Sequence, residues 1–309
     1  MILDRTIRRA AAALSALALL LAPPLLAREA TGAGSLAPVQ AGAPLRPALW
    51  LVRDADTAIY LFGTIHLLKP GLNWLNGPVA DALDRSDLLV TEMKLDEGGE
   101  FAMQGAMVRL ALLPKGQTLR GQLPPDLRER YEAVLAKEGI PAASYDGYKP
   151  WYVATVLSLT PAVKLGMVPQ GGVEGLLASA HGTASHEGLE TPEQQLRLFD
   201  DLSQDAQLAF LGAVARDYDS IGPNTEALVE AWGRGDVERI GAIMNADADT
   251  PELVEALLIR RNQSWAGWIE RRLAEPGTVF VAVGAGHLTG AASVQDQLAA
   301  AGLKTERVQ

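Results

Sequence analysis

The chain has 309 residues, a formal net charge of −10 and no cysteine. Without cysteine it can form neither a disulfide bond nor a thiol nucleophile, so its core must hold the fold together by itself. The acidic balance, with no stretch in which basic and aromatic residues alternate, argues against a nucleic acid partner.

The first residues have the composition of an export signal. Arg5, Arg8 and Arg9 precede an apolar run over residues 10–21. This run is shorter than the roughly 20 residues that span a bilayer, so a retained membrane anchor is the less favoured alternative, and no later segment is long and apolar enough to span a membrane. We expect an exported protein, periplasmic or secreted. The prediction comprises a signal peptide (1–27), a flexible leader rich in small residues and proline (28–46) and one folded domain (47–309).

Two short apolar strands begin the folded domain. The segments ALWLVR and TAIYLF flank residues 54–57, which predicts a β-hairpin. Gly63 and His66 follow in a Gly-x-x-His pattern, where glycine lets the backbone turn sharply and present the imidazole. A further buried strand, SDLLVTEMKL, ends near Glu92. Glu92 shares a sheet edge with His66 if the two strands run parallel; otherwise it is a solvated strand end.

From about Gly98 to Glu275 the pattern is mostly helical and predicts a large helical insertion or cap. Within it, Glu190 stands directly before the capping-box pattern TPEQ. The helix dipole stabilises a carboxylate there, which suits a metal ligand or a base and equally suits simple capping.

Arg261 lies in the predicted helix LVEALLIRRNQSWAGWIERRL, among leucines and tryptophans. Its guanidinium could hold a substrate carboxylate or phosphate, or orient a glutamate, and the alternative is a surface salt bridge. His181 and His186 lie in a Gly/Ser-rich connection and are expected to be solvated loop residues.

The chain ends in a strand-helix-strand alternation: TVFVAV, a helix near SVQDQLAAAGL and a last strand at LKTERV. We therefore predict an α/β fold with a mixed central sheet built from N- and C-terminal segments, flanking helices and a large helical insertion. A second Gly-x-x-His pattern, ending at His287, follows TVFVAV. Closure of the sheet would bring His287 next to His66 beyond the carboxyl ends of the strands, where such sheets bind ligands.

Two imidazoles and one carboxylate are a common ligand set for a catalytic divalent metal, because they hold the ion and leave a position for water. We predict His66, Glu92 and His287 as metal ligands. Glu190 would accept a proton from the bound water, and Arg261 would orient the substrate or offset developing charge. Manganese, cobalt and zinc all suit such ligands, and the sequence does not choose among them.

Five separated motifs resemble the TraB/GumN (TraB/PrgY/GumN) family, which is related to the Tiki metalloproteases. They are GTIHLL, LLVTEM, GVEGLLASAHG leading into GLETPEQQL, IRRNQSW and VAVGAGHLTG, in that order. The resemblance implies an α/β fold related to the erythromycin-esterase and ChaN-like group, and metal-dependent peptidase activity as in the Tiki branch. It also implies the same site: histidines 66 and 287, the carboxylates Glu92 and Glu190, and the fixed cation Arg261. One departure is Glu174, where the family pattern has aspartate.

The leading hypothesis is an exported metal-dependent hydrolase, acting on a peptide or small molecule and most suited to a peptide bond. One alternative is a metal-free, esterase-type hydrolase with a histidine as base and a carboxylate that orients it. A second is a non-enzymatic envelope protein that binds metal or haem through the same histidines. A third is a structural or regulatory partner in polysaccharide export. The sequence does not indicate an oligomeric state.

Overall fold

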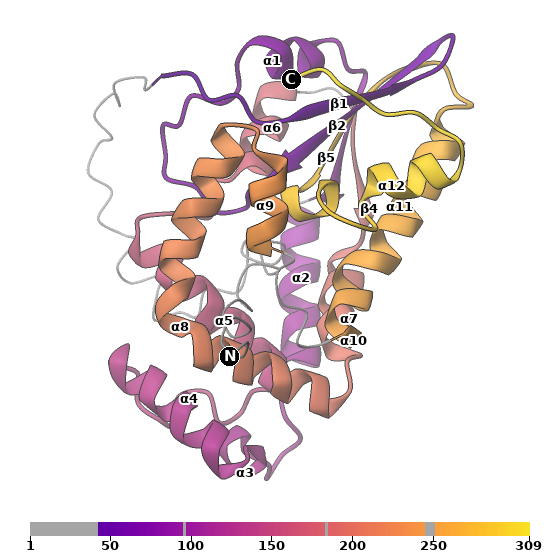
Figure 1. The fold of residues 1–309 in the computed structure, drawn as a ribbon. Helices are drawn as coiled ribbons and strands as arrows, with labels where there is room; N and C mark the ends of the chain where they lie inside the picture. Colours follow the sequence, from indigo (N-terminus) through magenta and orange to yellow (C-terminus); the bar gives the residue numbers. More distant parts are fainter. Residues whose placement is uncertain (1–42, 95–96, 183–184, 245–250) are drawn as a thin grey trace, which may run out of the picture.

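The central sheet is assembled from both ends of the folded domain (Figure 1). In the computed structural model, which describes residues 43–94, 97–182, 185–244 and 251–309, six strands lie in the order β4-β3-β5-β2-β1-β6. Their bounds are β1 (Leu49–Arg53), β2 (Thr57–Thr64), β3 (Leu88–Met93), β4 (Ser185–Glu190), β5 (Gly277–Gly284) and β6 (Glu306–Arg307). The predicted α/β fold, with a mixed sheet built from N- and C-terminal segments, is confirmed.

The directions of the strands place four strand ends at one edge of the sheet. β2, β5, β3 and β4 run parallel, whereas β1 is antiparallel to β2 and β6. Thr64 pairs with Gly284 at the ends of β2 and β5, and Met93 pairs with Glu190 at the ends of β3 and β4. Side chains at and just beyond these positions therefore converge at the carboxyl edge of the sheet.

Helices cover both faces of the sheet, which explains why its parallel strands are apolar on both sides. On one face, Phe62 and Phe280 pack with Trp74 and Trp232. On the other, Val281 and its neighbours pack against the helix that carries Arg261. The first face is covered by α1 (Gly77–Asp84), α6 (Val173–His181), α9 (Val237–Met244) and the end of α8 (Gln204–Gly233), the second by α11 (Arg260–Arg272) and α12 (Val294–Ala300).

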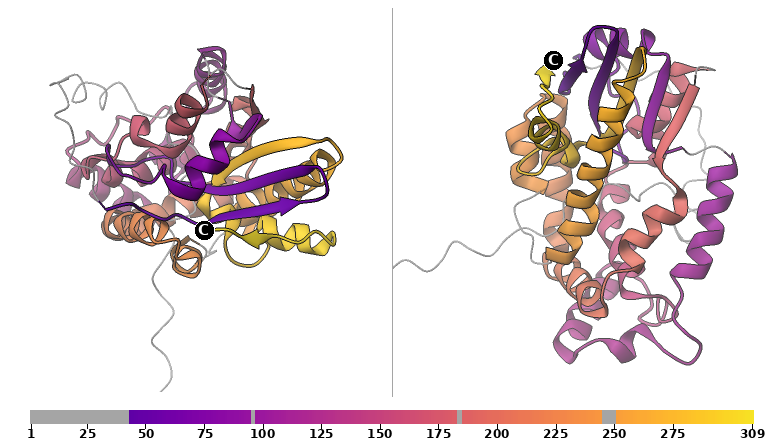
Figure 2. Two further views of the ribbon diagram at one scale, coloured as in Figure 1. Left: turned by 90° about the horizontal axis from the view of Figure 1, so that it is seen from above. Right: turned by 90° about the vertical axis from the view of Figure 1, so that its right-hand side faces the viewer.

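A helical body with its own core packs beyond the sheet (Figure 2). Trp151, Phe199 and Phe210 stack in this core. Phe199 also lines the pocket that holds both Gly-x-x-His histidines, so the site lies where sheet and helical body meet. The body consists of α2 (Glu97–Leu110), α3 (Leu119–Gln122), α4 (Pro125–Lys137), α5 (Pro150–Lys164), α7 (Pro192–Asp200) and the first part of α8.

The predicted helical middle contains a strand that the sequence pattern did not reveal. β4 has the sequence SHEGLE, lies at the edge of the sheet and is partly exposed, so it lacks the apolar run by which buried strands are recognised. The expectation that His181 and His186 are solvated loop residues is wrong. His186 lies in β4 with its Nε2 2.8 Å from Thr91 Oγ1, and His181 ends α6 with its Nε2 2.9 Å from the Ser86 carbonyl oxygen.

Within the described part of the chain, no helix is both long enough and apolar enough to cross a membrane. The predicted signal peptide (1–27) and most of the predicted leader (28–46) lie outside the described residues.

Candidate active site

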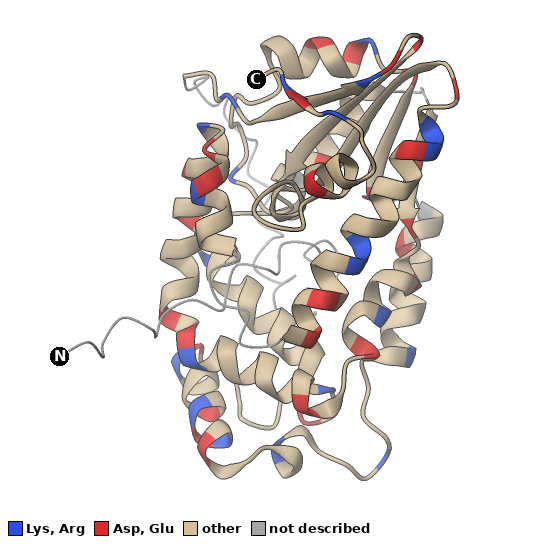
Figure 3. Cartoon of the chain, turned by 45° about the vertical axis from the view of Figure 1, so that its right-hand side comes forward, with Lys and Arg blue, Asp and Glu red and all other residues tan. Residues whose placement is uncertain are grey.

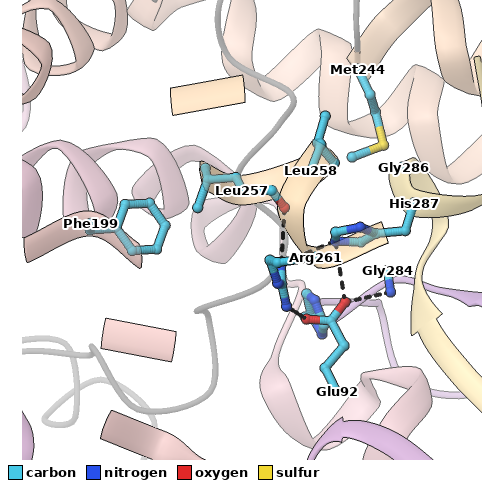
Figure 4. Close-up of a pocket in the computed structure, with 10 residues that line it drawn as sticks. Glu92, Phe199, Met244, Leu257, Leu258, Arg261, Gly284, Gly286 and His287 are labelled. Atoms are coloured by element: carbon cyan, nitrogen blue, oxygen red, sulfur yellow. Dashed lines mark hydrogen bonds and ion pairs between the residues drawn. The ribbon is translucent and has the colours of Figure 1, made fainter. Parts of the chain in front are cut away.

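Four ionisable side chains are buried together at the carboxyl edge of the sheet (Figure 4). His66, Glu92, Arg261 and His287 are 4%, 3%, 4% and 5% exposed. Elsewhere, acidic and basic residues alternate along the helices in the view of Figure 3. Burying a charge without a partner costs several kcal/mol, on the order of 3–5 kcal/mol when one member of a buried pair is removed, so the contacts of these four groups define the site.

Arg261 joins two carboxylates that come from neighbouring parallel strands. Its Nη2 donates to Glu92 Oε2 at 2.5 Å and to Glu190 Oε2 at 2.9 Å, and its Nε donates to Glu190 Oε1 at 2.8 Å. Gln195, buried in α7, donates to the same Glu92 and Glu190 oxygens at 3.2 and 2.8 Å. The Gly284 N–H donates to Glu92 Oε1 at 2.7 Å. Burial raises the pKa of Glu92, but the Arg261 charge, together with both histidines and the Gly284 N–H, outweighs burial and holds this pKa well below its ordinary value.

The remaining donors of Arg261 are also used. Nη1 donates to the Leu257 carbonyl oxygen at 3.2 Å and lies 3.0 Å from His287 Nε2. Leu257 belongs to a single π-helical turn (Glu255–Ile259) directly before α11, a local geometry common at functional sites. The guanidinium stands 4.6 Å from the centroid of the Trp265 ring. A guanidinium has five N–H donors, and the contacts with both carboxylates, Leu257 and His287 use all five.

His287 is held as a neutral imidazole. Its Nδ1 lies 2.6 Å from Asn262 Oδ1, and Asn262 Nδ2 donates to the Ala292 carbonyl oxygen at 2.8 Å. The amide orientation set by Ala292 makes Asn262 Oδ1 an acceptor, so the ring proton is on Nδ1 and Nε2 accepts from Arg261. Burial and the Arg261 charge together lower the pKa of His287 to about 3.

His66 is paired at only one nitrogen. Its Nδ1 lies 2.5 Å from Glu174 Oε1, a contact that becomes an ion pair when the imidazole is protonated. Its buried Nε2 has no hydrogen-bond partner among the described residues. The Val173 N–H donates to the Ile65 carbonyl at 3.1 Å, which places the first turn of α6, with Glu174, beside the imidazole.

Glu174 also controls the charge of His66. Burial alone would lower the pKa of His66, but the charge and contact of Glu174, together with the charge of Glu92, outweigh it and raise this pKa above its ordinary 6.5.

A cavity of about 20 Å³, room for one water molecule, is lined by the four buried ionisable residues. A Cβ added at Gly284 would lie 3.1 Å from Glu92 Oε1 and 3.8 Å from His66 Nε2, so glycine keeps this space open. Its other walls are apolar and consist of Phe199, Met244, Leu257 and Leu258, with Gly286 (Figure 4).

These contacts do not fit a metal ion held by His66, Glu92 and His287. A ligating imidazole needs a free lone pair, but His287 Nε2 already accepts an N–H from Arg261 and its Nδ1 carries the proton. Both oxygens of Glu92 accept N–H donors, and the adjacent guanidinium repels a cation. Across the residues described here, no three His, Asp or Glu side chains are arranged to hold a metal. The ligand set therefore stays a prediction, and it requires Arg261 to leave its partners.

The structure brings every predicted site residue to one place: His66, Glu92, Glu190, Arg261 and His287. It adds Glu174, Gln195 and Asn262, whose contacts the sequence did not reveal. Weak signals existed for two of them, because Asn262 directly follows Arg261 and Gln195 follows the capping-box glutamine. A contact with a residue more than 20 positions away is not encoded in either local pattern.

Comparisons with known proteins agree with the residue patterns. The TraB/PrgY/gumN family matches residues 48–307 of this chain. An uncharacterized protein of Escherichia coli (strain K12), YbaP, is 23% identical over 255 residues, which cover 82% of this chain and 92% of that protein. An uncharacterized protein of Treponema pallidum (strain Nichols) is 22% identical over 264 residues, 80% of this chain and 78% of that protein. No solved structure gives a significant match.

Proposed function

This chain belongs to the TraB/PrgY/gumN family, and from that premise we propose that it is a hydrolase in which His66 activates a water molecule. The observation that carries the proposal is the buried Nε2 of His66, which has no hydrogen-bond partner in the described chain and belongs to a side chain that lines a cavity for one water. An imidazole held at Nδ1 by a carboxylate, with Nε2 free, is the arrangement of a general base.

The reaction follows from these contacts. Nε2 of His66 takes a proton from water as the water oxygen bonds to the substrate carbonyl carbon. Glu174 fixes the ring and stabilises the imidazolium that forms. The same Nε2–H then gives its proton to the leaving nitrogen or oxygen as the bond from the carbonyl carbon breaks, which yields a carboxylic acid and an amine or alcohol.

Arg261 would act through its charge and not through a new hydrogen bond. All its N–H groups are already engaged, so it stays fixed while negative charge develops on the carbonyl oxygen. A preorganised charge in a water-poor site needs no rearrangement during the reaction, which is the condition for electrostatic stabilisation of a transition state. Glu190 and His287 hold this cation in place.

The first test measures hydrolysis of a peptide library and of simple esters by the protein that starts at Arg28, before and after treatment with a chelator. We expect activity that survives the chelator in wild type and is lost in His66→Ala. Bound metal is measured in parallel by mass spectrometry. Activity that is lost with the metal and restored by manganese, cobalt or zinc would overturn the metal-free mechanism.

A metal-dependent hydrolase is the second candidate, and one observation favours it. A carboxylate on Nδ1 of a histidine with a free Nε2 is also how proteins orient a metal-ligating imidazole. The resemblance to Tiki proteins favours a peptide bond as the substrate of either mechanism. In this candidate, metal loading would be lost in both His66→Ala and His287→Ala.

We propose further that the protein acts outside the cytoplasm, in the periplasm or as a secreted protein. Support comes from the arginines and the apolar run at the N-terminus. Cell fractionation with N-terminal sequencing tests this. A cytoplasmic protein with an intact N-terminus would contradict it.

A further inference from the structure

The Met244 side chain packs against Gly286, a residue of the second Gly-x-x-His turn that has no side chain of its own. A Cβ added at Gly286 would lie 2.7 Å from Met244 Cε and 3.1 Å from its Sδ. Met244 ends α9, is partly exposed, and directs its thioether toward Gly286 (Figure 4). Methionine is unbranched and has three rotatable bonds, so its tip can take another position with little strain.

The walls of the cavity divide into two chemical halves. At the polar end, Arg261 and Glu92 are fully paired, and His66 Nε2 is the atom left to meet a reacting group. At the other end Met244 stands with three further apolar side chains, Phe199, Leu257 and Leu258. None of these four offers a partner to a charged or polar group, so a charged substrate group would be buried there without compensation.

Because the cavity is small, an aliphatic ligand can enter only if one of the lining side chains moves. Its volume of about 20 Å³ holds a water molecule but no aliphatic group. Phe199 and Leu257 are buried in the core of the helical body and are held by their neighbours. Met244 and Leu258 are both partly exposed, and of the two Met244 has the unbranched side chain and stands at the end of its helix, so it is the wall that a ligand can displace.

We propose that the Met244 side chain occupies an apolar subsite, and that the substrate group beside the scissile carbonyl is an aliphatic chain that displaces it. The proposal rests on the proposed function, because it takes His66 as the point where the carbonyl lies. It assigns Met244, Leu258 and Gly286 as determinants of specificity.

A binding experiment tests the subsite without requiring hydrolysis. The chain has six methionines, so methyl-labelled methionine gives a simple NMR spectrum in which Met244→Leu identifies the Met244 signal. The probes are 2-heptanone, which water cannot cleave, and acetone, its short-chain match. We expect a saturable shift of the Met244 methyl with 2-heptanone, little shift with acetone, and an unmoved Met107 methyl on α2. An unmoved Met244 signal, or equal shifts with both ketones, would overturn the proposal.

Hydrolysis gives the second readout. We expect Met244→Ala to raise the ratio of kcat/KM for p-nitrophenyl octanoate over p-nitrophenyl acetate by about tenfold or more, and Met107→Ala to leave it unchanged. An unchanged ratio in Met244→Ala would overturn the subsite while leaving the hydrolase intact. If no variant cleaves either ester or any peptide but the NMR shift occurs, the proposed function fails and the apolar binding site stands.

Discussion

The two halves of the site differ in how their buried polar atoms are paired. Around Arg261 every N–H of the guanidinium has an acceptor, and Glu92 accepts three donors. His66 is as deeply buried, yet its Nε2 has no partner among the described residues. An unpaired buried polar atom costs about 1–3 kcal/mol, so its presence in a native protein needs a cause, of which a catalytic role is one. The Arg261 half is therefore held in one geometry by its contacts, and in the mechanism that we propose the His66 half is the part that reacts.

The largest effect is expected for Arg261→Met, which removes the cation from the fully paired half of the site. It leaves the buried Glu92 and the partly buried Glu190 without their cation, and we expect a loss of about 3–5 kcal/mol in the free energy of unfolding, measured by urea denaturation. Arg260→Met is the matched control, because Arg260 is the exposed neighbour on the same helix. It should change stability by no more than about 0.5 kcal/mol. Equal effects in the two variants would contradict a structural role for the buried cation.

His66→Ala should separate activity from stability. We expect hydrolysis to fall by about 10²–10⁴-fold, because the general base is lost. The variant should stay folded, with its free energy of unfolding within about 2 kcal/mol of wild type. His181→Ala, which alters a partly buried histidine away from the cavity, is the control and should keep its activity. Full activity in His66→Ala would contradict the proposed mechanism.

Asn262→Ala removes the acceptor that fixes the proton of His287 on Nδ1. We expect a loss of about 1–3 kcal/mol in stability, since the His287 N–H and the Ala292 carbonyl both lose a partner. The ¹⁵N chemical shifts of the His287 ring report the tautomer. They should indicate a single Nδ1–H form in wild type and a mixture in the variant. A ring that is already mixed in wild type would contradict the network.

The two site histidines should affect stability in different pH ranges, His287 below pH 6.5 and His66 above it. His287 has a folded pKa of about 3 against an ordinary 6.5, so the unfolded chain binds the proton first as pH falls. Stability should then drop below pH 6.5 by up to about 1.4 kcal/mol per pH unit from this group. The raised pKa of His66 has the reverse sign, since its contribution is present in acid and is lost as pH rises through the folded pKa. His287→Asn should flatten the acid slope, whereas His181→Gln should not.

The smallest predicted effect concerns the pH at which hydrolysis begins. His66 must lose its proton to act as base, so activity should rise with pH through its raised folded pKa. Glu174→Gln removes the negative charge that raises this pKa, and the rising limb of the kcat/KM profile should move to lower pH, with a rate lower by about tenfold. A limb that moves to higher pH, or does not move, would show that Glu174 does not control His66.

The sequence predicted the site residues that follow from strand order. His66, Glu92 and His287 come after or within short apolar strands, so parallel pairing alone brings them to one edge. It could not predict Glu174, because the contact with His66 depends on how the first turn of α6 packs against the turn after β2. That packing is tertiary and leaves no local pattern.

The metal ligand set, which stays a prediction, illustrates the same limit of sequence patterns. The kinds of residue at positions 66, 92 and 287 predicted His66, Glu92 and His287 as metal ligands. The kind of residue does not show whether its lone pairs are free to bind a metal. In this structure Arg261 donates to Glu92 Oε2 and to His287 Nε2, so these two atoms already use a lone pair. Edge strand β4 was missed for a related reason, since a polar, half-exposed strand has no apolar run to mark it.

The central place of β5 has a consequence for the order in which the molecule folds. β5 lies between β2 and β3, and the Gly284 N–H reaches Glu92 across 192 residues of sequence. Such distant pairings form slowly, because the intervening chain must close first. Neither the sheet nor the reactive centre can form until the last part of the chain has been synthesised. A chain still emerging from the ribosome, or truncated before β5, lacks His287 and the Gly284 N–H that holds Glu92, so its site is incomplete.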